Sequence, residues 1–176
     1  MTTSNWQLDK SHSGVTFSVR HMMITNVRGS FNEFDAAVTA DTDNLTAVDA
    51  TLTIDVNSIN TKDEGRDGHL KSPDFFNVEQ FPQIIFKKTS LVAKGGDDYS
   101  LTGDITIAGV TKSITLNTEI AGPAKDPWGN IKLGVVADGV INRSDFGLTY
   151  NAALETGGFL IGDAIKVHIE LEFAQA

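Results

Sequence analysis

The sequence predicts an all-β fold of roughly eight antiparallel strands with one short helical excursion around residues 61–80. Apolar and polar residues alternate in several segments, turn residues separate those segments, and one charged region breaks the alternation. Alternation that leaves one polar face is typical of an antiparallel sheet with one side in water. So many strands in one domain either close into an up-and-down barrel or stack as a sandwich, and the alternation alone leaves both open.

The strands are predicted from period-two alternation. The segments are residues 15–19, 47–56, 99–107, 112–120, 131–141 and 165–173. Turns are predicted at residues 94–98, 108–111 and 122–130, where glycine or proline supplies the necessary backbone. Gly103, Gly134 and Gly139 fall inside predicted strands, where glycine indicates the bulges or bends that a closing barrel requires.

The helical excursion is predicted where the alternation stops. Residues 61–80 are charged and irregular. Thr61 or Asp63 can cap a short helix, which ends near Ser72 because Pro73 follows. Three aromatic residues come next: Phe75, Phe76 and Phe81.

Composition limits the function. The 176 residues fit a single domain over 1–176, and the net charge of −9 repels phosphate backbones and anionic membrane faces. We therefore expect no nucleic-acid binding, no peripheral docking on membranes and no stable membrane insertion. The absence of cysteine excludes disulfides, thiolate catalysis and Cys-ligated metals. No run of about 18 apolar residues occurs and the first residues do not read as a secretory signal, so we expect a cytoplasmic protein.

The strand over 15–19 is the first clue to a binding site. It has an apolar face, with His12 shortly before it and His21 shortly after it. Strands of this kind build an apolar pocket with a polar mouth, which suits a carrier of an amphipathic molecule.

Several motifs carry a resemblance to a known family. In chain order they are 5–9 with 11–13, 19–21, 27–31, 58–61 with 66–76, 81–86, 101–112 and 142–147. In this order, over nearly the whole chain, the sequence resembles the YceI-like, polyisoprenoid-binding family. The resemblance implies an eight-stranded, lipocalin-like antiparallel barrel. It also implies an apolar channel for a long-chain isoprenoid lipid, such as a polyprenyl phosphate or an isoprenoid quinone.

Two groups of residues are candidates for contact with such a lipid. The candidate channel wall is Phe17, Val19, Met22, Met23, Phe31, Phe34, Phe75, Phe76, Phe81, Ile84 and Phe86. The candidate head-group contacts are His21, Arg28, Arg66 and His69, because arginine and histidine can pair with a phosphate or donate to a quinone oxygen.

Each candidate also has a purely structural interpretation. The wall residues fit a plain core equally well. Arg66 can form a solvated ion pair with Asp67. Arg28 can brace the rim of the barrel, and Arg143 with Asp145 can do the same at the far end. His12 suits a backbone hydrogen bond as well as a ligand contact. His168 alternates with charged residues and is expected to be exposed without a role.

Other functions are weighed against binding. A metal site from His12, His21 and His69 with Asp9, Asp63 or Asp67 lacks the spacing that presets geometry, and no G-x-S-x-G elbow occurs. We therefore expect no metal, no cofactor and no catalytic residue. Two alternatives stay open: an enzyme that acts on such a lipid through histidine acid–base groups, and a stress-related barrel that binds a partner and no ligand. A homodimer, through a sheet edge or mouth to mouth, also stays open.

Overall fold

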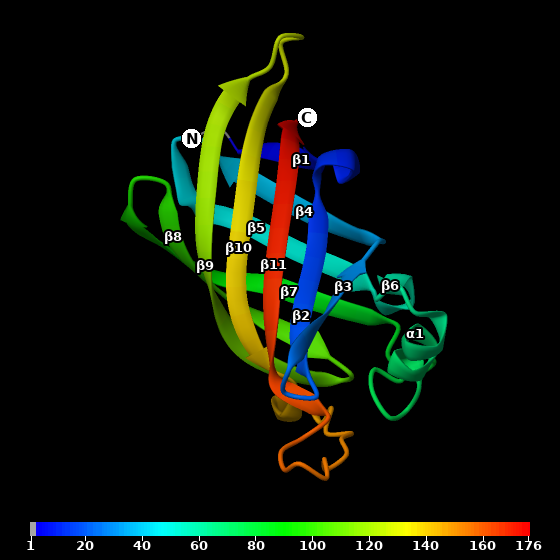
Figure 1. Cartoon of the computed structure of the whole chain (residues 1–176). Coiled ribbons are helices and arrows are strands. Elements are labelled where there is room, and N and C mark those ends of the chain that lie inside the picture. The colour runs from blue at the N-terminus through cyan, green and yellow to red at the C-terminus, as the bar shows by residue number, and fades with distance from the viewer. Residues whose placement is uncertain (1–2) are drawn as a thin grey trace.

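The computed structural model describes residues 3–176, which form one continuous β-sheet with a single α-helix (Figure 1). The strands are β1 (Ser4–Leu8), β2 (Gly14–His21), β3 (Thr25–Phe31), β4 (Phe34–Asp41), β5 (Asn44–Asp55), β6 (Ile59–Asn60), β7 (Gln83–Gly95), β8 (Asp98–Ile107), β9 (Val110–Lys125), β10 (Ile131–Asn142) and β11 (Ile161–Gln175). The helix is α1 (Glu64–Lys71), and the 3-10 helices are η1 (Lys10–His12), η2 (Val56–Ser58) and η3 (Arg143–Phe146).

Eight of the strands close into a barrel. Their order is β1-β4-β5-β7-β8-β9-β10-β11, and β11 pairs again with β1 through Trp6 opposite Gln175 and Leu8 opposite Phe173. Every pairing in this ring is antiparallel. The predicted eight-stranded antiparallel barrel is therefore confirmed, and the alternative of two stacked sheets is wrong.

The remaining strands form a flap, which we define as β2, β3 and β6. β2 pairs with residues 161–170 of β11, β3 pairs with β2, and β6 pairs with β3. One edge of β11 is thus shared between β1 and β2, and η1 bulges outward where one strand takes over from the other. At this point the Asp9 N–H donates to the Glu172 carbonyl (2.8 Å), and the Glu172 N–H donates to Ser13 Oγ (3.0 Å).

Local signals explain the helix and most turns. The Asp63 side chain accepts the Arg66 N–H at 3.0 Å as the N-cap, and α1 ends at Lys71 with Ser72 as the C-cap, near the predicted end. The turns after β7 and β8 contain Gly95, Gly96 and Gly109 at positive φ. The predicted turn at 122–130 begins later than expected, because β9 continues through Gly122 to Lys125 and keeps pairing with β10.

The hydrophobic core consists of two clusters that follow one another along the barrel. A cluster of Trp6, Ala40, Leu91, Ile120, Leu133 and Phe173 fills the end at which β1 meets β11. A larger cluster, which includes Val15, Phe31, Leu52, Phe86, Leu116 and Phe146, occupies the rest of the interior. Side chains therefore plug one end, and any internal space lies toward the other. Within residues 3–176, no helix has the length and apolarity needed to cross a membrane.

Candidate ligand-binding site

A cavity of about 350 Å³ lies inside the larger core cluster. Its wall comes from both the barrel and the flap, and it is almost entirely aliphatic and aromatic. This volume falls within the range of roughly 300–1,000 Å³ that is usual for small-molecule sites.

Most of the predicted wall residues reach this cavity. The lining includes Phe17, Val19, Phe31, Phe75, Phe76, Ile84 and Phe86. Phe75 and Phe76 follow α1, and the other five lie on the inward face of β2, β3 or β7.

The other predicted wall residues lie elsewhere. Met22 and Met23 occupy the exposed turn between β2 and β3. Phe34 is buried in the core cluster but does not line the cavity. Phe81 packs over Gly109, at which an added Cβ would lie 2.7 Å from the ring. Hydrophobicity alone did not separate these four from residues that face the cavity.

Polar side chains meet the cavity at the end opposite the plug. They include Arg20, His21, Arg66, His69, Arg143 and Tyr150. We call this end the mouth; it is bounded by the β2–β3 turn, α1 and the loop of residues 147–160 (Figure 1). In the described residues, no Asp or Glu lines the cavity, so its polar wall is cationic or neutral.

α1 contributes two of the predicted head-group residues. Arg66 donates from Nε to Thr61 Oγ1 (2.8 Å) and from Nη2 to the Thr61 carbonyl (2.7 Å). Asp67 accepts the N–H and hydroxyl of the same threonine, so it binds Thr61 rather than Arg66. His69 Nε2 lies 2.9 Å from Asp74 Oδ2, outside the cavity wall. The network fixes α1 to Thr61, directly after β6, and both Arg66 and His69 line the cavity.

The flap contributes one further head-group candidate. His21 ends β2, is half-buried and lines the cavity. Arg28 lies opposite Ser18 on β3, is exposed and does not line the cavity. Its neighbour Val27 faces the cavity instead, because adjacent residues of a strand point to opposite faces.

Arg143 is a cavity residue that the sequence placed wrongly. It is only 6 % exposed and donates to the carbonyls of Gly162 (2.9 Å), Leu148 (2.5 Å) and Ile161 (3.3 Å). Because Ile161 pairs with His21, Arg143 lies at the mouth and not at the far end. The acid whose charge acts on it is Asp163 rather than Asp145. Burial lowers the pKa of Arg143, and the charge of Asp163 partly offsets this effect.

The signal for Arg143 was already present in the motif of residues 142–147. Arginine is usually a surface residue, so the motif favoured a rim brace over a buried cation. In the structure, Arg143 holds the loop of residues 147–160 against β11 through the three carbonyls, which brings Tyr150 to the mouth.

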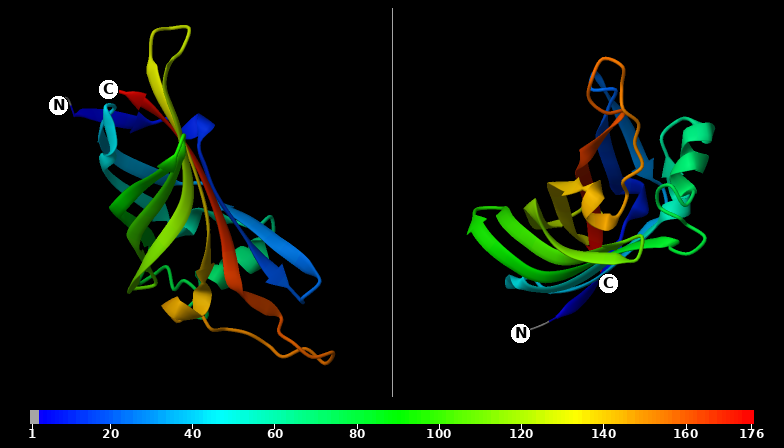
Figure 2. Two further views of the ribbon diagram at one scale, coloured as in Figure 1. Left: turned by 90° about the vertical axis from the view of Figure 1, so that its left-hand side faces the viewer. Right: turned by 90° about the horizontal axis from the view of Figure 1, so that it is seen from below.

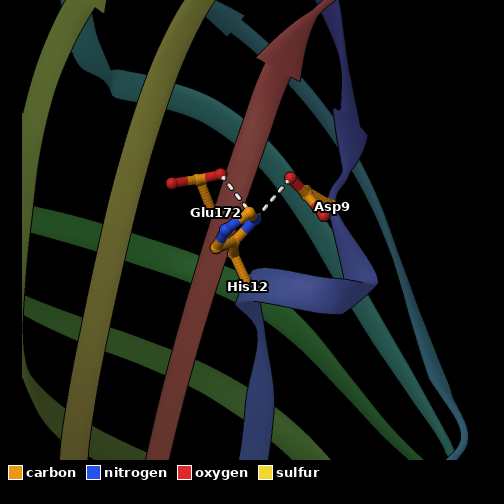
Figure 3. A group of neighbouring side chains, drawn as sticks. All are labelled: Asp9, His12 and Glu172. Carbon is orange, nitrogen blue, oxygen red and sulfur yellow. Dashed lines mark hydrogen bonds and ion pairs between the residues drawn. The ribbon is translucent and has the colours of Figure 1, made fainter.

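His12 lies outside the cavity, in a charged cluster at the junction of β1 and β2 (Figure 3). His12 Nδ1 is 2.9 Å from Asp9 Oδ2 and 3.5 Å from Glu172 Oε2. The Nζ atom of Lys132 lies 3.7 Å from both carboxylates. The hydrogen bonds from Ser11 and His12 hold the pKa of Asp9 well below its usual value, and the hydrogen bond to Asp9 raises the pKa of His12.

This cluster has the residue types of a metal site, since one atom from each of Asp9, His12 and Glu172 lies within 4.8 Å of the others. The Lys132 ammonium already lies within ion-pair distance of both carboxylates, and a divalent cation would have to displace it. His21 and His69 lie at the mouth instead, so the histidines do not converge. The arrangement fits an ion-pair network that pins η1 to β11. His168 is exposed as predicted, with Nδ1 bonded to Asp138 Oδ1.

The comparisons with known proteins agree with this architecture. The model of the YceI-like domain matches residues 6–173. A UPF0312 protein of Staphylococcus aureus strain MSSA476 is 41 % identical over 172 residues, covering 97 % of this chain and 98 % of that protein.

Two solved structures share the fold. BcnA of Burkholderia cenocepacia superposes with a TM-score of 0.82 at 24 % identity, covering 94 % of this chain and 98 % of BcnA. A polyisoprenoid-binding domain from Saccharophagus degradans superposes with a TM-score of 0.69 at 18 % identity, covering 97 % of this chain and 98 % of that domain. From the domain match and the level of identity to its relatives, the chain belongs to the YceI-like family.

Proposed function

We propose that this protein binds a long-chain isoprenoid lipid, with the tail in the cavity and the head group at the mouth. The observation that carries the proposal is the apolar cavity of about 350 Å³ with its cationic and neutral polar groups gathered at one end. An amphipathic molecule with one apolar chain matches that division. The Saccharophagus neighbour, which shares the fold, is described as a polyisoprenoid-binding domain.

Apolar burial supplies the driving force for such binding. Each buried CH₂ group contributes about 0.8 kcal/mol, so a five-carbon isoprene unit contributes roughly 3 kcal/mol. A few units are therefore enough for firm binding even after the cost of ordering the chain. The phenylalanines of the wall suit an unsaturated, branched tail, because aromatic rings offer large contact areas.

The head group is assigned to His21, Arg66 and His69. All three line the cavity at the mouth, and no carboxylate in the described wall opposes an anion there. A phosphate would accept charge-assisted hydrogen bonds from Arg66 and from a protonated imidazole, and a quinone oxygen would accept one from either histidine.

We propose a carrier rather than an enzyme. Within the described residues, the cavity wall pairs no histidine with a carboxylate that also faces the ligand. Asp74, the partner of His69, lies outside the wall. Incubation of the protein with a bound polyprenyl phosphate, followed by mass analysis, distinguishes the two: a carrier returns the lipid unchanged, whereas an enzyme converts it.

The experiment that tests the function is native mass spectrometry of freshly purified protein, followed by organic extraction of the ligand. We expect a stoichiometric long-chain isoprenoid, or stoichiometric uptake of added polyprenyl phosphate or isoprenoid quinone. A protein that arrives bare and takes up neither lipid contradicts the proposal and leaves the partner-binding barrel as the better explanation.

A further inference from the structure

Exposed apolar side chains gather beside the mouth. Met22, Met23 and Ile24 in the β2–β3 turn are 43 %, 57 % and 70 % exposed, and Phe159 is 63 % exposed. We call these four residues the apolar tip. Solvent-facing methionine, isoleucine and phenylalanine in one place indicate a surface that meets another apolar surface.

The tip is one surface built from two segments. The Met22 N–H donates to the Leu160 carbonyl at 2.8 Å, which joins the β2–β3 turn to the loop before β11. Within the turn, Arg20 Nη2 donates to the Met23 carbonyl at 3.1 Å. Met23 also packs against Gly158 so closely that an added Cβ would overlap its sulfur. Figures 1 and 2 show the β2–β3 turn beside the loop that precedes β11, at the end of the molecule away from both termini.

The tip is continuous with the cavity. His21, which precedes Met22, lines the cavity, as do Leu160 and Ile161 directly after Phe159. An apolar chain that left the cavity through the mouth would therefore pass beside the tip.

Two arginines flank the tip although the net charge of the protein is −9. The β2–β3 hairpin, residues 14–31, contains Arg20 and Arg28 and no Asp or Glu. Two acids lie on the other segment: Glu155 in the loop of residues 147–160, and Asp163, which shares a small pocket with Arg20 and Phe159. Arg28 lies opposite Ser18, two residue pairs along the hairpin from Arg20 opposite Asn26. Exposed apolar side chains flanked by arginines are the combination that binds the interface of an anionic membrane.

We infer that the apolar tip docks the mouth onto an anionic phospholipid surface. This inference rests on the proposed function, because an isoprenoid lipid resides in membranes and must enter the protein from one. Met22, Met23, Ile24 and Phe159 enter the interfacial layer, and the nearby arginines pair with lipid phosphates. The contact is shallow and reversible and involves no stable insertion. It departs from the expectation, drawn from the net charge of −9, that anionic membrane faces repel the protein, because the hairpin at the tip carries arginines and no Asp or Glu. A second copy is a poor occupant, because two tips would bring like-charged arginines together.

The test is flotation of the protein with vesicles of phosphatidylcholine and phosphatidylglycerol, compared with vesicles of phosphatidylcholine alone. We expect the wild type to float with the anionic vesicles, and an Ile24→Ser/Phe159→Ser variant to bind them at least about tenfold more weakly. Neither residue lines the main cavity. The matched control is Trp128→Ser, because Trp128 is 84 % exposed in the β9–β10 turn at the plugged end. Arg28→Gln should reduce the preference for anionic vesicles.

Several outcomes overturn the inference. Equal flotation of wild type and the double variant, an equal loss on Trp128→Ser, or no flotation of the wild type would do so. A wild-type dimer in analytical ultracentrifugation would also overturn it if Ile24→Ser dissociates that dimer, since the tip would then bind a second copy. Binding of polyprenyl phosphate in vesicle-free solution is measured in parallel. If it persists while flotation fails, the docking is wrong and the proposed function stands.

Discussion

The imidazole of His69 packs edge-on against the ring of Tyr150, with their centroids 4.8 Å apart and their planes at 82°. Phe75 completes the group, 5.0 Å from His69 and 5.2 Å from Tyr150. The contact joins α1 to the loop after η3, and all three rings line the cavity. The cluster therefore forms part of the cavity wall at the mouth.

Tyr150→Ala should release a bound lipid faster. The substitution removes two aromatic contacts, each worth about 0.5–1.5 kcal/mol, so we expect the dissociation rate to rise roughly tenfold. Stopped-flow release of dansyl-farnesol measures this rate. Tyr150→Phe keeps the ring and should behave as wild type; a release rate unchanged in Tyr150→Ala would show that the cluster does not control exit.

Arg143→Met should destabilise the protein by about 2–4 kcal/mol, because three carbonyls lose a charged donor. Arg143→Lys should recover only part of this loss, since one ammonium does not span the three acceptors. Urea denaturation gives the free energies of unfolding. The exposed Arg28→Met serves as control and should change stability by less than about 0.5 kcal/mol; a similar effect at both positions would contradict the bracing role of Arg143.

The charged cluster at η1 should make stability depend on pH. The pKa of Asp9 is lowered from 3.8, so its contribution is present above that value and is lost as pH falls below it. The pKa of His12 is raised from 6.5, so its contribution is present below 6.5 and is lost as pH rises through the raised pKa. The cluster thus stabilises the folded protein most between pH 3.8 and pH 6.5, where Asp9 is ionised and His12 is protonated.

An NMR titration of the His12 ring protons checks this prediction. Asp9→Asn should bring the pKa of His12 back toward 6.5, and Lys132→Met should raise it further, because the lysine charge opposes protonation. If Asp9→Asn leaves that pKa unchanged, the ion pair is absent in solution.

Ile114→Phe should block the cavity. Ile114 is half-buried and lines it, so a larger ring occupies space that a lipid tail needs. We expect binding of polyprenyl phosphate to weaken at least about tenfold without a large fall in melting temperature. Ser113→Phe, on the exposed outer face of the same strand, is the matched control; equal binding by both variants would place the tail elsewhere.

His21→Ala should weaken binding of a polyprenyl phosphate more than binding of a hydrocarbon of the same length. The reason is that His21 lines the cavity at its mouth, where the head group is proposed to lie, and not in the deeper wall that contacts the tail. Isothermal titration calorimetry with each ligand gives the ratio of the dissociation constants of the variant and the wild type. His168→Ala, a histidine on the outer surface, should change neither. An equal loss for both ligands in His21→Ala would remove this histidine from the head-group site.

The local features of the fold could be predicted, because they are encoded by neighbouring residues. Alternation defined β5, β8 and β11, and Asp63 with Ser72 defined α1. The shared edge of β11 could not be predicted. It depends on pairing between Trp6 and Gln175, which are far apart in sequence, and no local pattern specifies such a partner.

The site residues divide in the same way, into those that local sequence predicts and those that depend on tertiary contacts. Phe17 and Val19 line the cavity because period two fixes which face a strand residue takes, and both belong to the predicted strand over 15–19. Met22 and Met23 were misplaced because a turn at positive φ interrupts that period, and Arg143 because its burial arises only from tertiary contacts. Patterns of hydrophobicity report which face is apolar, but not whether that face meets a cavity, a core or a membrane.

The division of the β11 edge between β1 and β2 bears on how the protein is made. β11 follows every other strand in the chain, so β1 and β2 leave the ribosome long before their common partner exists. Until β11 emerges, β1 is paired only with β4 and β2 only with β3, and the barrel is an open sheet with two free edges. Closure is therefore a late and nearly all-or-none event in biogenesis, and a lipid can be enclosed only after it.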